Sequence, residues 1–295
     1  MAESIGNSNL ITRNYLDSLL IETRYMNSTV PDTTMELYGK KFSSPIMTAA
    51  LSHLDHFMFE GATKAYAQGT AKADCILWLG MAEDAEVEAC AGAGAPMIEI
   101  IKPYADRELI FQKIRHAQGL GLLAVGVDID HPFGEDGSHD VVDGKEMAPL
   151  TRKELKKICK STDLPVIVKG VLSVYDANEA IEAGAQGIVL SHHNNRIEYA
   201  IPPLMALPEI RRYMDKDIPI FVDGDIRSGM DAFKALALGA TAVCIGRPLM
   251  TAIKKDGADG VAAYLEEVKA QLKKAMAYTG CTTLSKMDPG VIHHI

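Results

Sequence analysis

Eight short apolar runs rich in β-branched residues recur along the chain from about Pro45, and longer segments of helical period separate them. This alternation is typical of repeated βα units around a parallel sheet. The runs are PIMTAA near residue 45, CILWL near 75, PMIEII near 96, LLAVGVD near 122, PVIVKG near 165, GIVLS near 187, PIFVDG near 219 and AVCIG near 242. Eight strands predict a closed (β/α)8 TIM barrel, a fold that commonly takes about 250 residues.

The segments between the runs mostly end at glycine, the residue that best tolerates the left-handed conformation at a helix C-terminus. The endings EAGAQGIVL and ALGATAVCI share one layout, and this internal repetition supports the strand count. We expect one domain over residues 1–295, with about residues 1–40 as an N-terminal extension packed on the bottom or side of the barrel. The helices expected most clearly span residues 84–92, 107–118, 177–183, 229–238 and, at the end of the chain, 260–278.

Composition narrows the class of protein. A formal net charge of -9 argues against nucleic acid as a partner, because binding a phosphate backbone needs clustered Lys and Arg. The five cysteines show no CxxC or metal-like spacing, and an odd number fits a reduced compartment. No stretch approaches the roughly 18 apolar residues of a membrane span. We therefore expect a cytoplasmic protein without membrane contact.

Active sites of such barrels lie at the carboxyl ends of the strands, so polar residues just after the runs are the candidates. The segment 130–147 follows the fourth strand, is polar and contains glycine, and we expect it to cover the mouth as a lid. Lys169 directly after PVIV is unusual for a strand end, although a lysine beginning an exposed loop is an equally good interpretation. The other strand-end candidates are Asp128, Ser191, His192, His193, Asp223, Arg227, Gly246 and Arg247.

The last two units read DGDIRSG and IGRP, so glycines, helix starts and two arginines follow adjacent strands. Backbone N–H groups and a helix N-terminus at this place commonly bind phosphate in barrels. The sixth strand ends in SHHNNR, where His193 and Arg196 can serve as a general base and a carboxylate clamp. Asp128 can hold the tautomer of the histidine ring, or simply cap a loop.

His192 is the histidine we assign a structural role, because neighbouring residues of a strand face opposite ways. A metal site is not expected, since four other histidines show no ligand-like spacing; these are His53, His56, His131 and His139.

The chain resembles the FMN-dependent α-hydroxy-acid oxidases and dehydrogenases, the family of glycolate oxidase, lactate oxidase and mandelate dehydrogenase. The resemblance runs through LYGKKFSSPIMTAA, PVIVKGV, EAGAQGIVLSHHNNR, IPIFVDGDIRSGMDAFKALALGATAVCIGRPLM and AMAYTGCTTL. It implies an FMN cofactor, a small 2-hydroxy acid as substrate and a homo-oligomer, often a tetramer in this family. His193 would then be the catalytic base, Arg196 the ligand of the substrate carboxylate and Asp128 the orienting aspartate.

The same resemblance implies the flavin site residue by residue. Lys169 and Ser191 would lie beside the ring, with Lys169 stabilising the reduced anionic flavin, and Ala49 and Ala50 would contact it through their backbone. Glu99 would take the place of a glutamine that touches the flavin. The ribityl and phosphate groups would lie on Asp223, Gly224, Asp225, Arg227, Gly246 and Arg247.

The chain also departs from the family. His-Gly-Gly-Arg reads His193-Asn194-Asn195-Arg196, which puts two side chains near the substrate. Glu99 and Ile101 replace the glutamine and a tyrosine, and Gly126 replaces a threonine. Asp225 replaces the second glycine of the phosphate motif, a change that keeps the backbone contact if φ is negative. The N-terminal region is shorter than is usual in the family, and the segment HPFGEDG after the fourth strand contains no arginine.

These departures leave three functions open. The first is oxidation of a small 2-hydroxy acid. The second is another flavin reaction, as in the type 2 isopentenyl diphosphate isomerase, where no hydroxy acid reduces the flavin. The third is a catalytically degenerate flavin-binding protein. The joint presence of Lys169, His193, Arg196 and Asp128 favours the first.

Overall fold

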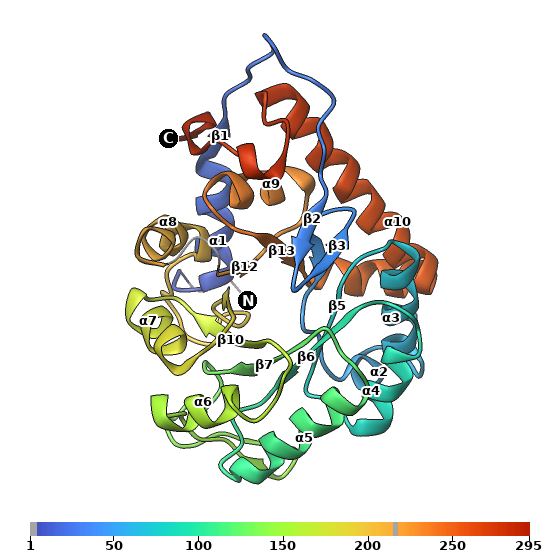
Figure 1. Ribbon diagram of the computed structural model, residues 1–295, viewed down its shortest axis with the longest axis vertical. Coiled ribbons are helices and arrows are strands. Elements are labelled where there is room, and N and C mark those ends of the chain that lie inside the picture. The colour runs from blue at the N-terminus through green and yellow to red at the C-terminus, as the bar shows by residue number, and fades with distance from the viewer. Residues whose placement is uncertain (1–4, 215–217) are drawn as a thin grey trace.

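In the computed structural model, which describes residues 5–214 and 218–295, helices surround a barrel of eight parallel strands (Figure 1). The strand order β4-β13-β12-β11-β10-β7-β6-β5 follows the chain around the barrel, and bridges from Met47 to Ile76 and from Leu51 to Leu79 join β4 to β5. The predicted TIM barrel is confirmed. The barrel strands are β4 (Ile46–Thr48), β5 (Leu77–Gly80), β6 (Met97–Ile101), β7 (Ala124–Asp128), β10 (Val166–Val171), β11 (Gly187–Leu190), β12 (Ile220–Asp223) and β13 (Ala242–Ile245).

Helices connect these strands, and several begin at a side-chain cap. Ser173 and Ser228 each accept a bond from the backbone N–H three residues on, which satisfies one free donor of α7 and of α9. The helices around the barrel are α2 (Leu54–Phe57), α3 (Ala62–Lys72), α4 (Asp84–Ala91), α5 (Arg107–Gly119), α6 (Arg152–Cys159), α7 (Val174–Ala183), α8 (Pro203–Tyr213), α9 (Gly229–Ala237) and α10 (Arg247–Thr279).

The final helix is longer than expected. α10 begins at Arg247 rather than near residue 260, directly after β13. Asp256 and Gly257 inside it have non-helical dihedral angles, with φ of 51° at Gly257, so the element is two helices joined at a kink.

Alternating side chains divide the core into two layers. One layer fills the barrel and includes Ile98, Ile100, Ile167 and Phe221, whereas Met97 belongs to the layer between strands and helices. Because side chains alternate along a strand, the last inward-facing residue at the carboxyl end of each strand is the one that reaches the mouth of the barrel.

The N-terminal extension contributes to both ends of the barrel. The hairpin β2 (Met35–Leu37) and β3 (Lys40–Phe42) packs its apolar side chains on the barrel interior, and Tyr38 Oη donates to the carbonyl of Gln186 just before β11. The hairpin therefore lies at the bottom of the barrel, next to the amino end of β11. Helix α1 (Ser8–Ser18), in contrast, reaches the loops of the mouth; residues 1–4 of the extension lie outside the described residues.

Two further short strand pairs lie outside the barrel. Strand β1 (Leu19–Ile21) pairs with β14 (Ile292–His294), and β8 (Val141–Val142) pairs with β9 (Lys145–Glu146) in the loop after β7. Two single turns of 3₁₀ helix, Leu284–Lys286 and Pro289–Val291, precede β14. Over the part of the chain that is described, no helix is long and apolar enough to cross a membrane.

Candidate active site

The ends of β4, β10, β11, β12 and β13 enclose a cavity of about 280 Å³ at the mouth of the barrel. Its walls bring together most of the predicted site: Ala49, Ala50, Lys169, Ser191, His193, Asp223, Gly224, Asp225, Gly246 and Arg247. A second cavity, of about 560 Å³, lies beside it and shares Ser191 and His192. Arg196 lies on the second cavity together with Asp130 and Phe133.

Lys169 is the inward residue at the end of β10 and is buried, so the alternative of an exposed loop lysine is wrong. Its Nζ donates to Asp128 Oδ1 at 2.9 Å, and Lys102 Nζ donates to Asp128 Oδ2 at 2.7 Å. Burial opposes both charged forms here, but the opposite charges outweigh it: the pKa of Lys169 is raised and that of Asp128 is lowered. A buried carboxylate is thus held between two ammonium groups.

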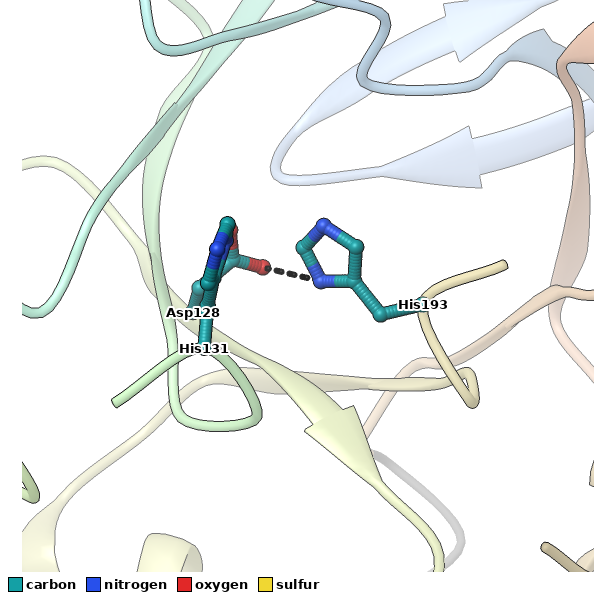
Figure 2. Close-up of side chains that lie close together, drawn as sticks. All are labelled: Asp128, His131 and His193. Atoms are coloured by element: carbon teal, nitrogen blue, oxygen red, sulfur yellow. Dashed lines mark ion pairs between the residues drawn. The ribbon is translucent and has the colours of Figure 1, made fainter. Parts of the chain in front are cut away.

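His193 points its Nδ1 at two carboxylates. Asp130 Oδ1 lies 2.8 Å from Nδ1 and Asp128 Oδ1 lies 3.8 Å from it, so Asp130 is the hydrogen-bond partner. Figure 2 shows the other ring nitrogen directed away from Asp128. The Asp130 carboxylate accepts a hydrogen bond from Nδ1–H, which leaves Nε2 with its lone pair on the open side. Sequence analysis had given the orienting place to Asp128.

Gly170 makes this position of Asp130 possible. The strand is irregular between Lys169 and Val171, and Gly170 has φ of 97°. A Cβ at Gly170 would lie 2.2 Å from Cγ of Asp130, so no other residue leaves room for the carboxyl group. The second oxygen of Asp130 is buried next to Gly170 and has no hydrogen-bond partner.

Arg196 is engaged by the loop after β7. Its Nη2 donates to Asp140 Oδ2 at 2.5 Å and to the carbonyl of Phe133. His131 Nε2 lies 2.9 Å from the same Asp140 oxygen, and burial, followed by the charge of Lys102, lowers the pKa of His131 to about 4. The loop expected to act as a lid therefore contacts the predicted clamp through Asp140.

Asp128, His131 and His193 offer ligand atoms within 4.8 Å of one another (Figure 2). A cation there would meet two positive charges, because Nζ of Lys102 contacts both Asp128 and His131 Nδ1 and Nζ of Lys169 contacts Asp128. The arrangement suits proton handling better than metal binding.

The sequence predicts that Asn194 and Asn195 lie near the substrate, whereas in the structure both side chains bind helix α1. His193, Asn194 and Asn195 have φ of 47°, 57° and 66°, a left-handed run that glycine and asparagine tolerate best. Their side chains hold α1: Asn195 Oδ1 accepts from the N–H of Ser8 at 2.6 Å, and Asn194 Oδ1 accepts from Asn9 Nδ2 at 3.1 Å.

His192 faces α1 as well, because its Nε2 lies 2.9 Å from Thr12 Oγ1. The two neighbouring histidines therefore have separate partners, and the one next to the mouth carboxylates is His193.

The phosphate motif also differs from expectation. Asp225 has φ of 57°, so the condition of a negative φ is not met, although aspartate tolerates this conformation better than most residues. Its carboxylate is turned toward Arg227 and Arg247. Arg247 begins α10, where Gly246 precedes the first turn, and a Cβ on Gly246 would approach Ala49 Cβ to 3.2 Å.

Glu99 lies away from the mouth, which corrects its assignment to the flavin. It is buried in β6 on the face toward the helices, where its nearest charges are Lys113 and His116 of α5 and Asp84 of α4. Ile98 and Ile100 fill the barrel instead, so the next inward residue is Lys102. A shift of one residue moves every side chain to the opposite face, and the assignment had slipped by one.

Burial raises the pKa of Glu99 to about 7, and one of its oxygens has no hydrogen-bond partner. Because the folded pKa lies above the ordinary glutamate pKa of 4.5, the carboxyl destabilises the fold increasingly from about pH 4.5 to 7 and fully above it. We expect the free energy of unfolding of Glu99→Gln, measured relative to the native chain, to be larger at pH 8 than at pH 5 by on the order of 2 kcal/mol. Urea unfolding at both pH values measures this; exposed Glu60→Gln should show no such gain, and an equal gain at both pH values would contradict the assignment.

The comparisons with known proteins agree with this geometry. A model of the FMN-dependent dehydrogenase family matches residues 6–149 and 135–294. The chain belongs to this family. Glycolate oxidase of Spinacia oleracea is 30% identical over 316 residues, 94% of this chain and 85% of the relative. Glycolate oxidase 2 of Oryza sativa subsp. japonica is 32% identical over 298 residues, 88% and 80% of the two chains.

Solved structures of mandelate oxidase are similar as well. The structure with 3,3-difluoro-2-hydroxy-3-phenylpropionic acid has a TM-score of 0.88 and 27% identity, covering 99% of this chain and 91% of that one. A mutant structure with a monooxide FMN adduct has a TM-score of 0.87 and 27% identity over 99% and 92%. The protein is thus an enzyme of the FMN-dependent α-hydroxy-acid oxidase family, and its cofactor is FMN.

The main cavity fits that cofactor chemically. A fixed positive charge from Lys169, the small residues Ala49 and Ala50 and the polar Ser191 line one part of it. Arg247, Gly246 and the N-terminus of α10 line another, where a phosphate finds donors and a favourable helix end. Arg227 does not line this cavity, but it forms an ion pair with Asp225, which does.

Sequence reasoning missed four residues of the mouth: Lys102, Asp130, His131 and Asp140. Correct alternation along β6 would have identified Lys102. Asp130 and His131 could also have been identified, because polar residues directly after the fourth strand are candidates for the mouth of the barrel. Nothing in the sequence marks Asp140, because its role depends on how the loop folds back.

Proposed function

We propose that this enzyme oxidises a small 2-hydroxy acid to the 2-oxo acid, with His193 as the general base and Arg196 as the ligand of the substrate carboxylate. The observation that carries the proposal is the bond from His193 Nδ1 to Asp130, because it leaves Nε2 free to take a proton. Bound FMN supplies the two-electron acceptor. A degenerate scaffold has no need to keep a base and its orienting carboxylate in this arrangement.

Charge around the base supports this role. Lys169 Nζ lies 3.3 Å from His193 Nδ1, so a protonated ring would meet a cation unless carboxylates compensated for it. Asp130 at 2.8 Å and Asp128 at 3.8 Å from Nδ1 supply that compensation. The ring can therefore accept a proton from substrate while its charge remains balanced. We propose Asp128 as the group that fixes Lys169 beside the flavin.

The substrate we propose carries an apolar side chain. Arg196 lies on the second cavity, whose walls are largely hydrophobic. An acid whose carboxylate replaces Asp140 on Arg196 would extend its side chain along these walls, where burial of apolar surface favours binding. The apolar lining consists of Ile129, Pro132, Phe133, Leu172 and Ile197.

Anaerobic titration of the FMN-loaded enzyme with glycolate, lactate and mandelate tests the function. The oxidised-flavin absorbance band should disappear with at least one acid, and more readily with the larger two than with glycolate. The matching 2-oxo acids, which have no hydrogen to lose from the α-carbon, are the controls and should leave the band in place. Bound flavin that none of these acids reduces would favour the isomerase-like or degenerate alternatives.

Location and assembly remain part of the proposal: a single-domain, cytoplasmic homo-oligomer, a tetramer by analogy with its family. All five cysteines are free thiols, which suits a reducing compartment. Light scattering coupled to size exclusion gives the mass in solution, and a monomer would remove the tetramer from the proposal.

A further inference from the structure

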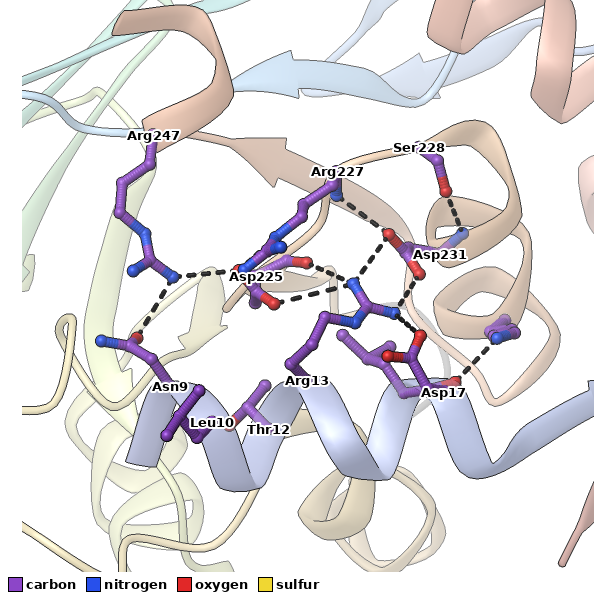
Figure 3. Close-up of polar contacts among 12 residues, drawn as sticks. Asn9, Leu10, Thr12, Arg13, Asp17, Asp225, Arg227, Ser228, Asp231 and Arg247 are labelled. Atoms are coloured by element: carbon purple, nitrogen blue, oxygen red, sulfur yellow. Dashed lines mark hydrogen bonds and ion pairs between the residues drawn. The ribbon is translucent and has the colours of Figure 1, made fainter. Parts of the chain in front are cut away.

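Three arginines from different parts of the chain converge on the carboxylate of Asp225 (Figure 3). Arg227 Nε lies 2.8 Å and Arg247 Nη2 lies 3.0 Å from Asp225 Oδ1. Arg13 of α1 lies 3.6 Å from Oδ2 and also donates to the Asp225 carbonyl at 3.2 Å. A carboxylate thus already pairs with the arginines that a phosphate would use.

The side chain of Asp225 is enclosed. It is 2% exposed, it borders the flavin cavity beside Gly224 and Arg247, and its Oδ2 has no hydrogen-bond partner. A buried carboxylate oxygen without a donor is unfavourable, which makes this position unusual for a structural residue. The left-handed φ of Asp225 directs the group at the arginines where a glycine would put nothing.

The charges of this cluster balance without any ligand. Arg13 pairs with Asp231 at 2.8 Å and Asp17 at 2.7 Å, while Arg227 and Arg247 share Asp225. A phosphate entering here meets arginines that are already neutralised and a negative carboxylate next to them. The like charge reduces the attraction that the arginines alone would provide.

We propose that Asp225 is a built-in counter-ion of the flavin phosphate site and weakens the contribution of the phosphate group to cofactor binding. The enzyme then distinguishes FMN poorly from riboflavin, which has the same ring and ribityl chain without the phosphate. Helix α1 takes part through Arg13, which holds the backbone of Asp225 in place.

The test compares the affinities of the apoprotein for FMN and for riboflavin by quenching of flavin fluorescence. In Asp225→Asn, which keeps size and tolerates the left-handed φ, we expect the Kd for FMN to fall about tenfold or more, because one buried negative charge is removed. The Kd for riboflavin should change less than about twofold, since riboflavin has no charge there to respond. Asp17→Asn is the matched control: it removes a carboxylate from the same network, but Asp17 is 66% exposed and does not line the cavity.

The proposal is supported if the Kd falls only for FMN and only in Asp225→Asn. It is overturned if the variant binds FMN no better or more weakly, if both flavins gain equally, or if Asp17→Asn gives the same gain. Asp225→Gly, which also suits the positive φ, serves the same comparison if the asparagine variant does not fold. The measurement needs no hydroxy acid, so its result is independent of the proposed reaction.

Discussion

A His193→Asn variant is expected to bind FMN normally and to be reduced by hydroxy acid about 10²- to 10⁴-fold more slowly than the native enzyme, the usual contribution of a general base. Asparagine is chosen because residue 193 has φ of 47°, which alanine tolerates poorly. Stopped-flow absorbance under anaerobic conditions measures the rate of flavin reduction, and the flavin spectrum reports occupancy.

His293→Asn is the control for this experiment. His293 lies on β14 and is 57% exposed in its side chain, where it pairs with Glu22 and lines neither cavity. It should leave the rate of reduction within about twofold, as surface substitutions usually have small effects. Unchanged reduction in His193→Asn would remove the histidine from the base role, even if FMN binding is intact.

An Asp130→Asn variant is expected to lose about 10²-fold or more in the rate of flavin reduction with FMN still bound. An amide next to His193 Nδ1 can donate a hydrogen bond, which favours the tautomer with a protonated Nε2 and no lone pair for the substrate. Loss of the carboxylate also removes a negative charge that balances the protonated ring. Slow reduction with FMN still bound separates this role from a merely structural one.

Asp128→Asn discriminates between the two carboxylates. Because Asp128 pairs with Lys102 and Lys169, we expect this change to weaken FMN binding, whereas Asp130→Asn should leave FMN bound. The opposite result, normal FMN binding with slow reduction in Asp128→Asn and native reduction in Asp130→Asn, would restore Asp128 as the orienting group.

Much of the barrel was predictable because its signals are local. Apolar runs and glycine-ended helices depend on neighbouring residues, and the phosphate loops follow adjacent strands. Side-chain direction was predictable only where the strand register was right: an error of one residue placed Glu99 at the mouth instead of in the helix layer, and the inward-facing Lys102 was missed. Contacts between distant segments, such as Asp140 with Arg196, depend on loop geometry that no short pattern records.

The contacts of helix α1 have a practical consequence for handling the protein. Its first residues touch the histidine loop through Asn195 and the phosphate loop through Arg247, and the carbonyl of Gly6 accepts a bond from Tyr199. A purification tag at the N-terminus would therefore begin a few residues from the mouth. Helix α1 has 11 residues, about 16 Å, and the C-terminal Ile295 bonds to Ser18 at its far end (Figure 1). A C-terminal tag is the safer choice for any assay of flavin retention.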